Sequence, residues 1–154
     1  MSDRQVNLTT PDLAILVVGA AHAVATRLGR ELNAAGYPVR QQHGYVLRAL
    51  HERPLGLTGL AELLGVTKQA VSPVVDEMVD LGLVERRADP ADRRAKLLAL
   101  TRRGTAARAR ALEVSAALER ETPDAAAVRA GLLALIEAEG FGDDAAHRRA
   151  RPVW

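Results

Sequence analysis

Residues 58–100 carry the pattern that most constrains this chain, a pair of short helices followed directly by a basic hairpin. The segment LTGLAELLGVTKQAVSPVVDEMVDLGL predicts one short helix, a turn at Gly65, and a second helix capped by Thr67. The segment VERRADPADRRAKLLALT then predicts two short strands joined by a loop that contains Asp and Pro. Helix, turn, helix and hairpin in this order are typical of a winged helix-turn-helix DNA-binding lobe.

The rest of the chain is expected to be helical. Apolar residues recur at helical spacing from residue 13, which predicts a long first helix with Pro11 and Asp12 in its first turn and an end near Gly36. The other expected helices cover residues 40–52, 59–64 with Thr58 as N-cap, 68 to about 81, 102 to about 120 with Thr101 as N-cap, and 123 to about 140 with Thr122 as N-cap. The expected strands cover residues 83–87 and 96–100.

These elements predict a fold that is mainly α with a small β-hairpin wing (α+β), a winged helix-turn-helix flanked by long dimerisation helices. At 154 residues the chain is long enough for one such domain with extensions. We expect an N-terminal dimerisation helix in residues 1–38, the winged helix-turn-helix DNA-binding lobe in 39–101, C-terminal dimerisation helices in 102–140 and a basic tail in 141–154.

Positive charge is concentrated in one part of the sequence. Residues 86–110 hold nine cationic side chains against two aspartates, a local charge of +7 in a chain whose formal net charge is only +2. The remainder is therefore about −5, and such polarity suits a molecule that presents one face to a polyanion. A solvated charged surface is the alternative explanation for this segment taken alone.

Composition excludes several other classes of protein. The chain has no cysteine, which removes disulfides, thiolate chemistry and zinc–cysteine sites. It shows no nucleophile–base pair, no metal-ligand cluster and no phosphate-binding glycine loop, so we expect neither an enzyme nor a cofactor. The apolar run over residues 13–25 is thirteen residues long, too short to span a membrane, and the segment before it lacks the net positive charge of a signal peptide. The sequence therefore favours a cytoplasmic protein.

The helix after Thr67 is the candidate recognition helix. Only its first half can lie deep in a DNA groove, because its second half carries acidic residues that phosphate repels. In the first half, Gln69 can read adenine through its amide, Lys68 can meet guanine or phosphate, and Ser72 can bond to either. Pro73 costs less near a helix start than in its middle, and its ring can touch a thymine methyl. An amphipathic surface helix with incidental polar residues is the alternative.

The loop between the two strands is the candidate wing. Arg93 and Arg94 at its tip can enter a minor groove, and the flanking Arg86 and Lys96 add positive charge. We interpret Asp92 as a brace that fixes the loop by pairing with Arg94, Arg86 or Arg87. The alternative is an exposed ion pair that contributes little to stability.

The segments LAELLGVTKQAVSPVVDEMVDLGLVER, DPADRR and LTRRG resemble the MarR family of winged-helix transcriptional regulators, closely over about residues 40–105. The resemblance implies a homodimer with intertwined terminal helices that binds a palindromic operator in double-stranded DNA. It places groove contacts on Thr67, Lys68, Gln69 and Ser72, and the wing contact on Arg93 or Arg94.

The resemblance also implies a ligand site between the dimerisation helices and the DNA-binding lobe, where many relatives hold small aromatic or phenolic anions. The candidate effector residues in that region are Tyr37, Arg40, His43 and Tyr45. An arginine with a tyrosine or histidine can hold an aromatic carboxylate, although such residues also serve in packing. The functional expectation is a ligand-responsive repressor. A winged-helix module that binds another protein and has no specific DNA binding is the alternative.

Overall fold

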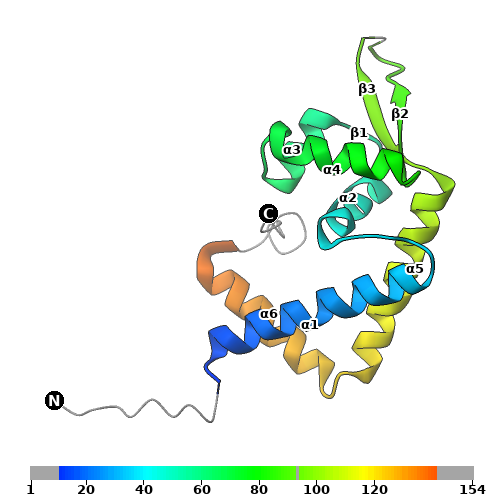
Figure 1. Cartoon of the computed structure of the whole chain (residues 1–154). Helices are drawn as coiled ribbons and strands as arrows, with labels where there is room; N and C mark the ends of the chain where they lie inside the picture. Colours follow the sequence, from blue (N-terminus) through cyan, green and yellow to red (C-terminus); the bar gives the residue numbers. More distant parts are fainter. Residues whose placement is uncertain (1–10, 93, 142–154) are drawn as a thin grey trace.

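Two groups of helices stand at opposite ends of the molecule (Figure 1). The computed structural model describes residues 11–92 and 94–141; the expectations for residues 1–10, for Arg93 and for the tail beyond residue 141 lie outside this range. The elements are α1 (Leu13–Ala34), α2 (Gln41–Glu52), β1 (Leu55–Gly56), α3 (Leu57–Leu64), α4 (Lys68–Asp80), β2 (Val84–Ala88), β3 (Lys96–Leu100), α5 (Arg102–Glu121), α6 (Ala125–Ile136) and the π-helical turn η1 (Glu137–Phe141). The fold is mainly helical with a small antiparallel sheet, as the sequence predicts.

The core lies where α2, α3 and α4 meet the sheet. Val71, Val75 and Met78 on α4 are fully buried and form the inward face of this helix. Leu47 of α2 and Leu60 of α3 are likewise buried among them. At roughly 2 kcal/mol for each fully buried aliphatic side chain, this cluster is the main source of stability in the lobe.

The sheet has three strands in the order β1-β3-β2, one more than the sequence predicts. β1 pairs antiparallel with β3 through Leu55 opposite Leu98, and the hairpin pairs Val84 with Leu100. β1 has only two residues and follows Pro54, so it offers no alternation of apolar and polar residues that could reveal it. β2 starts one residue later than expected.

Three helix starts are fixed by side-chain caps. The side chains of Asp12, Thr67 and Thr101 accept hydrogen bonds from the backbone amides three residues ahead, at 3.0 to 3.1 Å. Both threonine caps were expected, whereas Asp12 is the cap of α1 rather than part of its first turn. Two other expected caps are wrong, since α3 starts after Gly56 instead of Thr58 and α6 starts after Asp124 instead of Thr122.

The junction between the lobe and α5 is tight at Gly104. A Cβ atom built on Gly104 would lie 2.0 Å from the carbonyl oxygen of Leu83, a distance that no side chain tolerates. Thr101 closes the same junction, because its amide donates to the Leu83 carbonyl at 3.1 Å and its hydroxyl donates to the Gly82 carbonyl at 2.6 Å. The glycine in the LTRRG segment therefore lets α5 start directly against the turn that precedes β2.

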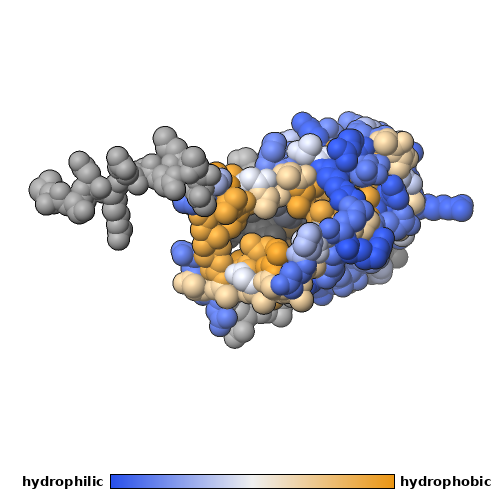
Figure 2. All heavy atoms as spheres, turned by 90° about the horizontal axis from the view of Figure 1, so that it is seen from below, coloured by the Kyte–Doolittle hydropathy of each residue, from blue (hydrophilic) through white to orange (hydrophobic). Residues whose placement is uncertain are grey.

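The helices at the end away from the wing expose apolar side chains. Val18 on α1 is 69% exposed, and Val128 on α6 is 48% exposed. Figure 2 views this end of the molecule and shows apolar side chains gathered around a hollow. α1 has 22 residues, not the thirteen of its apolar run, and by length and composition alone it could cross a membrane. It packs against α5 within the fold, but apolar side chains such as Ile15 and Val18 remain exposed on it.

Candidate nucleic-acid interface and cavity

The first half of α4 presents the predicted groove contacts to solvent. Thr67, Lys68, Gln69 and Pro73 are exposed and Ser72 is half-buried, while Val71 and Val74 hold the opposite face in the core. The helix continues through Pro73, which lies in its second turn. The exposed polar side chains therefore sit at the positive end of the helix dipole, where phosphate is favoured.

Two of the three acidic residues in the second half of α4 are paired with cations of the protein itself. Asp76 forms an ion pair with Arg86 at the base of the wing, and Glu77 forms one with Arg40 at the start of α2. These pairs reduce the repulsion that the carboxylates would exert on a DNA backbone. Arg86, expected as a DNA contact, is thus engaged in the free protein in holding the wing against the recognition helix.

Asp92 braces the wing loop, but through the backbone of Arg94 and not through the expected ion pair with an arginine side chain. Its carboxylate accepts a hydrogen bond from the backbone amide of Arg94 at 2.9 Å. Asp89 acts in the same way on the amide of Ala91 at 2.8 Å. The cations suggested as ion-pair partners are bonded elsewhere: Arg86 pairs with Asp76, and Arg87 pairs with Glu85. The side chain of Arg94 is exposed and extends from a loop whose backbone these bonds hold in turns. Lys96 is exposed at the start of β3.

His43 of α2 is buried against α4, and both of its ring nitrogens are hydrogen-bonded. Its Nδ1 accepts from the backbone amide of Arg40 at 3.2 Å, so Nε2 carries the ring proton and donates to Oε2 of Glu77 at 3.2 Å. Burial lowers the pKa of His43 against the opposing effect of Glu77. The hydrogen bond from Arg40 is the largest cause that lowers the pKa of Glu77. The histidine is therefore neutral near pH 7 and the glutamate charged.

A cavity of about 480 Å³ lies between α1, α2 and α5 and reaches Leu132 of α6. Its walls are mostly apolar, with Val24 and Leu28 of α1 facing Tyr45 of α2. Arg40, Arg48 and Arg108 also line it, and none of the lining residues in the described part of the chain is acidic. The Nε atom of Arg108 is buried and has no hydrogen-bond partner among the described residues. Burial is the largest cause that lowers the pKa of its guanidinium. The site is therefore an apolar pocket with a cationic wall.

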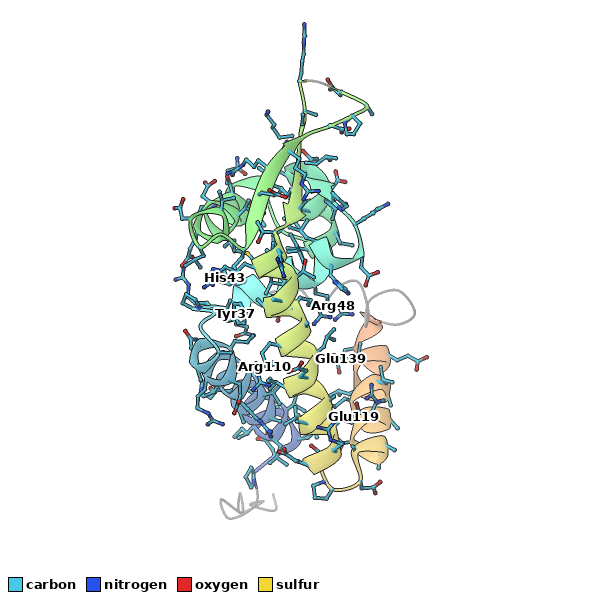
Figure 3. The ribbon with its side chains drawn as sticks, turned by 90° about the vertical axis from the view of Figure 1, so that its right-hand side faces the viewer. Tyr37, His43, Arg48, Arg110, Glu119 and Glu139 are labelled. Atoms are coloured by element: carbon cyan, nitrogen blue, oxygen red, sulfur yellow. The ribbon has the colours of Figure 1, made fainter. Side chains whose placement is uncertain are left out.

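The cavity brings together only part of the predicted effector set. Arg40 and Tyr45 line it, whereas Tyr37 and His43 do not. Tyr37 instead lies beneath Arg103, whose guanidinium carbon is 5.3 Å from the ring centre. Figure 3 shows Tyr37 and His43 on one flank of α5 and Arg48 on the other.

Two cavity arginines escaped the sequence analysis. Arg48 follows Gln41, Gly44 and Tyr45 at helical spacing on α2, so this periodicity could have revealed it. Arg108 belongs to α5, and only the packing of α5 against α2 brings it to the cavity.

A helix-turn-helix with its recognition face exposed, beside a braced basic hairpin, defines a winged-helix DNA-binding protein. The model of the MarR family matches residues 35–95 of this chain, which is less than half of its length. A curated relative, the HTH-type transcriptional regulator PetP of Rhodobacter capsulatus, is 38% identical over 98 residues, which are 59% of this chain and 52% of PetP. The alignment thus spans only about half the length of that relative.

Solved structures share the architecture over most of the chain. CouR from Rhodococcus jostii RHA1, bound to p-coumaroyl-CoA, is 28% identical with a TM-score of 0.65, and the match covers 86% of this chain and 94% of CouR. The reduced form of MarR from E. coli is 22% identical with a TM-score of 0.66, covering 82% of this chain and 97% of that one. The second likeness, at this identity, concerns the fold alone.

Proposed function

We propose that this protein is a homodimeric, sequence-specific regulator of transcription in the cytoplasm, a ligand-responsive repressor that binds a palindromic operator. The observation that supports this proposal most is the way that exposure and charge are distributed along α4. Lys68 and Gln69 face solvent on its first half, while Asp76 and Glu77 on its second half are neutralised by arginines. A surface helix that binds nothing would gain nothing from an exposed polar first half and ion-paired carboxylates in its second half.

Contacts with DNA are proposed for the exposed residues of α4 and the wing. Gln69 and Lys68 read base edges in the major groove, with Thr67, Ser72 and Pro73 beside them. Arg93 and Arg94 reach the adjacent minor groove, and Lys96 contacts the backbone. Occlusion of a promoter by the bound dimer would then give repression.

Salt dependence tests the proposed footprint. A dimer that neutralises about eight to ten phosphates should show a slope of log affinity against log salt of about −7 to −9. We expect that slope in a fluorescence anisotropy titration on a duplex that the protein itself selects from a random library. A slope shallower than about −3 would contradict a footprint of this size.

The exposed apolar faces of α1 and α6 support the homodimer. Side chains such as Ile15, Val18 and Leu133 cost free energy in water, and a second copy would bury them. We expect a chain that lacks residues 1–35 to be monomeric in analytical ultracentrifugation and to bind DNA weakly. A truncated protein that sediments as a dimer would contradict the placement of the interface on α1.

The cavity supports a small aromatic or phenolic anion as the effector. Its apolar walls fit a ring, and its arginines fit a carboxylate or a phenolate. One relative of similar fold, CouR, holds p-coumaroyl-CoA, a phenolic acyl thioester with phosphate groups. A ligand bound here would touch α1, α2 and α5, and could change the separation of the two lobes, which must sit about 34–36 Å apart on DNA.

A further inference from the structure

Arg40 belongs to the cavity and to the recognition helix at the same time. It is the N-cap residue of α2 and contributes to the cavity wall, yet its guanidinium forms an ion pair with Glu77 of α4. Its side chain is 64% exposed, so solvent rather than packing surrounds the charged end. An anion that enters the cavity therefore meets an arginine whose present partner is a carboxylate on the DNA-reading element.

His43 completes the connection on the buried side. It is 0% exposed, and its two ring nitrogens bond to the Arg40 amide and to Glu77. Packing holds this ring in place, whereas the long exposed side chain of Arg40 can swing at little cost. Glu77 is thus held by one fixed partner and one movable partner, both from the start of α2.

We propose that Arg40, His43 and Glu77 form a relay in which an anion in the cavity withdraws the guanidinium of Arg40 from Glu77 and so loosens the attachment of α4. Glu77 acts as a positioning residue, since it touches neither ligand nor DNA in this arrangement. The relay rests on the proposed function, and it specifies how a ligand in the cavity controls DNA binding.

The charges around the site favour such an exchange. Within the described residues, the lining includes three arginines and no carboxylate, so the cavity attracts an anion. A ligand carboxylate can replace the carboxylate of Glu77 on Arg40 with no net loss of an ion pair there. Of the two side-chain bonds that the described residues make to Glu77, the one from His43 then remains, so α4 keeps one of these two polar links to the start of α2. Because linkage is reciprocal, DNA that holds α4 in place must weaken ligand binding by the same factor.

The test uses 8-anilinonaphthalene-1-sulfonate, an aromatic anion that fluoresces on entering an apolar site. DNA affinity is measured with and without saturating dye, on the duplex selected by the wild-type protein, and the ratio of the two dissociation constants is the coupling factor. For the wild type we expect a factor of about ten or more. For Glu77→Gln we expect a factor within about twofold of one, with dye affinity unchanged or higher, because Arg40 no longer has a competing carboxylate.

Asp80→Asn is the matched control, since it removes the same charge from the same helix without touching Arg40. It should keep the wild-type coupling factor. Arg40→Gln, a change at an exposed side chain, should abolish coupling and also weaken dye binding. Gly44→Leu should remove the dye signal, because a Cβ on Gly44 meets no atom within 4 Å and the larger side chain enters the cavity.

The outcomes separate the relay from the function. A Glu77→Gln protein with the wild-type coupling factor would overturn the relay and leave the regulator intact. A wild-type protein that binds the dye without any loss of DNA affinity would overturn both the relay and the ligand response. A dye signal that survives Gly44→Leu would place the anion outside the cavity and overturn the relay too.

Discussion

Gly104→Ala is expected to destabilise the protein by about 3 kcal/mol or more, the upper part of the range for overpacked sites. The added Cβ would meet the Leu83 carbonyl oxygen at 2.0 Å and its carbon at 3.0 Å, and both are backbone atoms that cannot rotate away. Relief requires α5 to move off the turn before β2, which breaks the contacts of Thr101 with Gly82 and Leu83. Urea unfolding at a fixed protein concentration, followed by circular dichroism, measures the loss.

Gly29→Ala is the control for this prediction. Gly29 lies inside α1, and a Cβ there meets no atom within 4 Å. Alanine favours a helix interior by up to about 1 kcal/mol over glycine, so this variant should be as stable as the wild type or more stable. Equal unfolding midpoints for Gly104→Ala and Gly29→Ala would contradict the tight junction.

Replacing both Arg93 and Arg94 by alanine is expected to weaken DNA binding by about a hundredfold or more, at roughly 1–3 kcal/mol for each specific contact. The structural reason lies in the loop, because Asp89 and Asp92 hold its backbone in turns and Arg94 is exposed at its end. Fluorescence anisotropy at constant salt measures the effect. The unfolding midpoint should stay at the wild-type value, because Arg94 makes no packing contact in the core.

A general loss of positive charge must be separated from the loss of the wing. Arg30→Ala combined with Arg120→Ala removes two charges from exposed positions on α1 and α5, away from the wing. This control should lower DNA affinity by no more than about threefold, because charges beyond a Debye length act weakly on bound DNA. If it matched the wing variant, the arginines of the wing would have no special role.

Local signals in the sequence were enough for most of the fold. The N-caps Thr67 and Thr101 and the glycine turn at Gly65 act within one helical turn of the residues they fix, so their pattern can be recognised without tertiary information. β1 could not be recognised, because its two residues become a strand only by pairing with β3, more than forty residues later. Thr58 is not the N-cap of α3 for the same reason, because the strand ends at Gly56 and the helix starts at the next residue.

The sequence predicts where several residues of the site lie, but it does not predict which residues they pair with. The exposed half of α4 follows from helical periodicity. Arg40 and Tyr45 were expected at the cavity from the resemblance alone, together with Tyr37 and His43, which do not line it. The pairing of Arg40 and His43 with Glu77 spans 37 and 34 residues, and no spacing rule reaches that far. For this reason Glu77 could be recognised from the sequence as a carboxylate that phosphate would repel, but not as a link to the cavity.

Sequence specificity is the central claim, and selection from a random duplex library tests it most directly. The purified protein is carried through rounds of binding, and the enriched duplex is then compared by anisotropy with a shuffled duplex of the same composition. We expect a palindrome whose half-sites lie about one helical turn apart, bound at least about 10³-fold more tightly than its shuffled version. Enrichment of no common sequence, with equal weak affinity for both duplexes, would contradict the regulator and favour a winged-helix module that binds another protein.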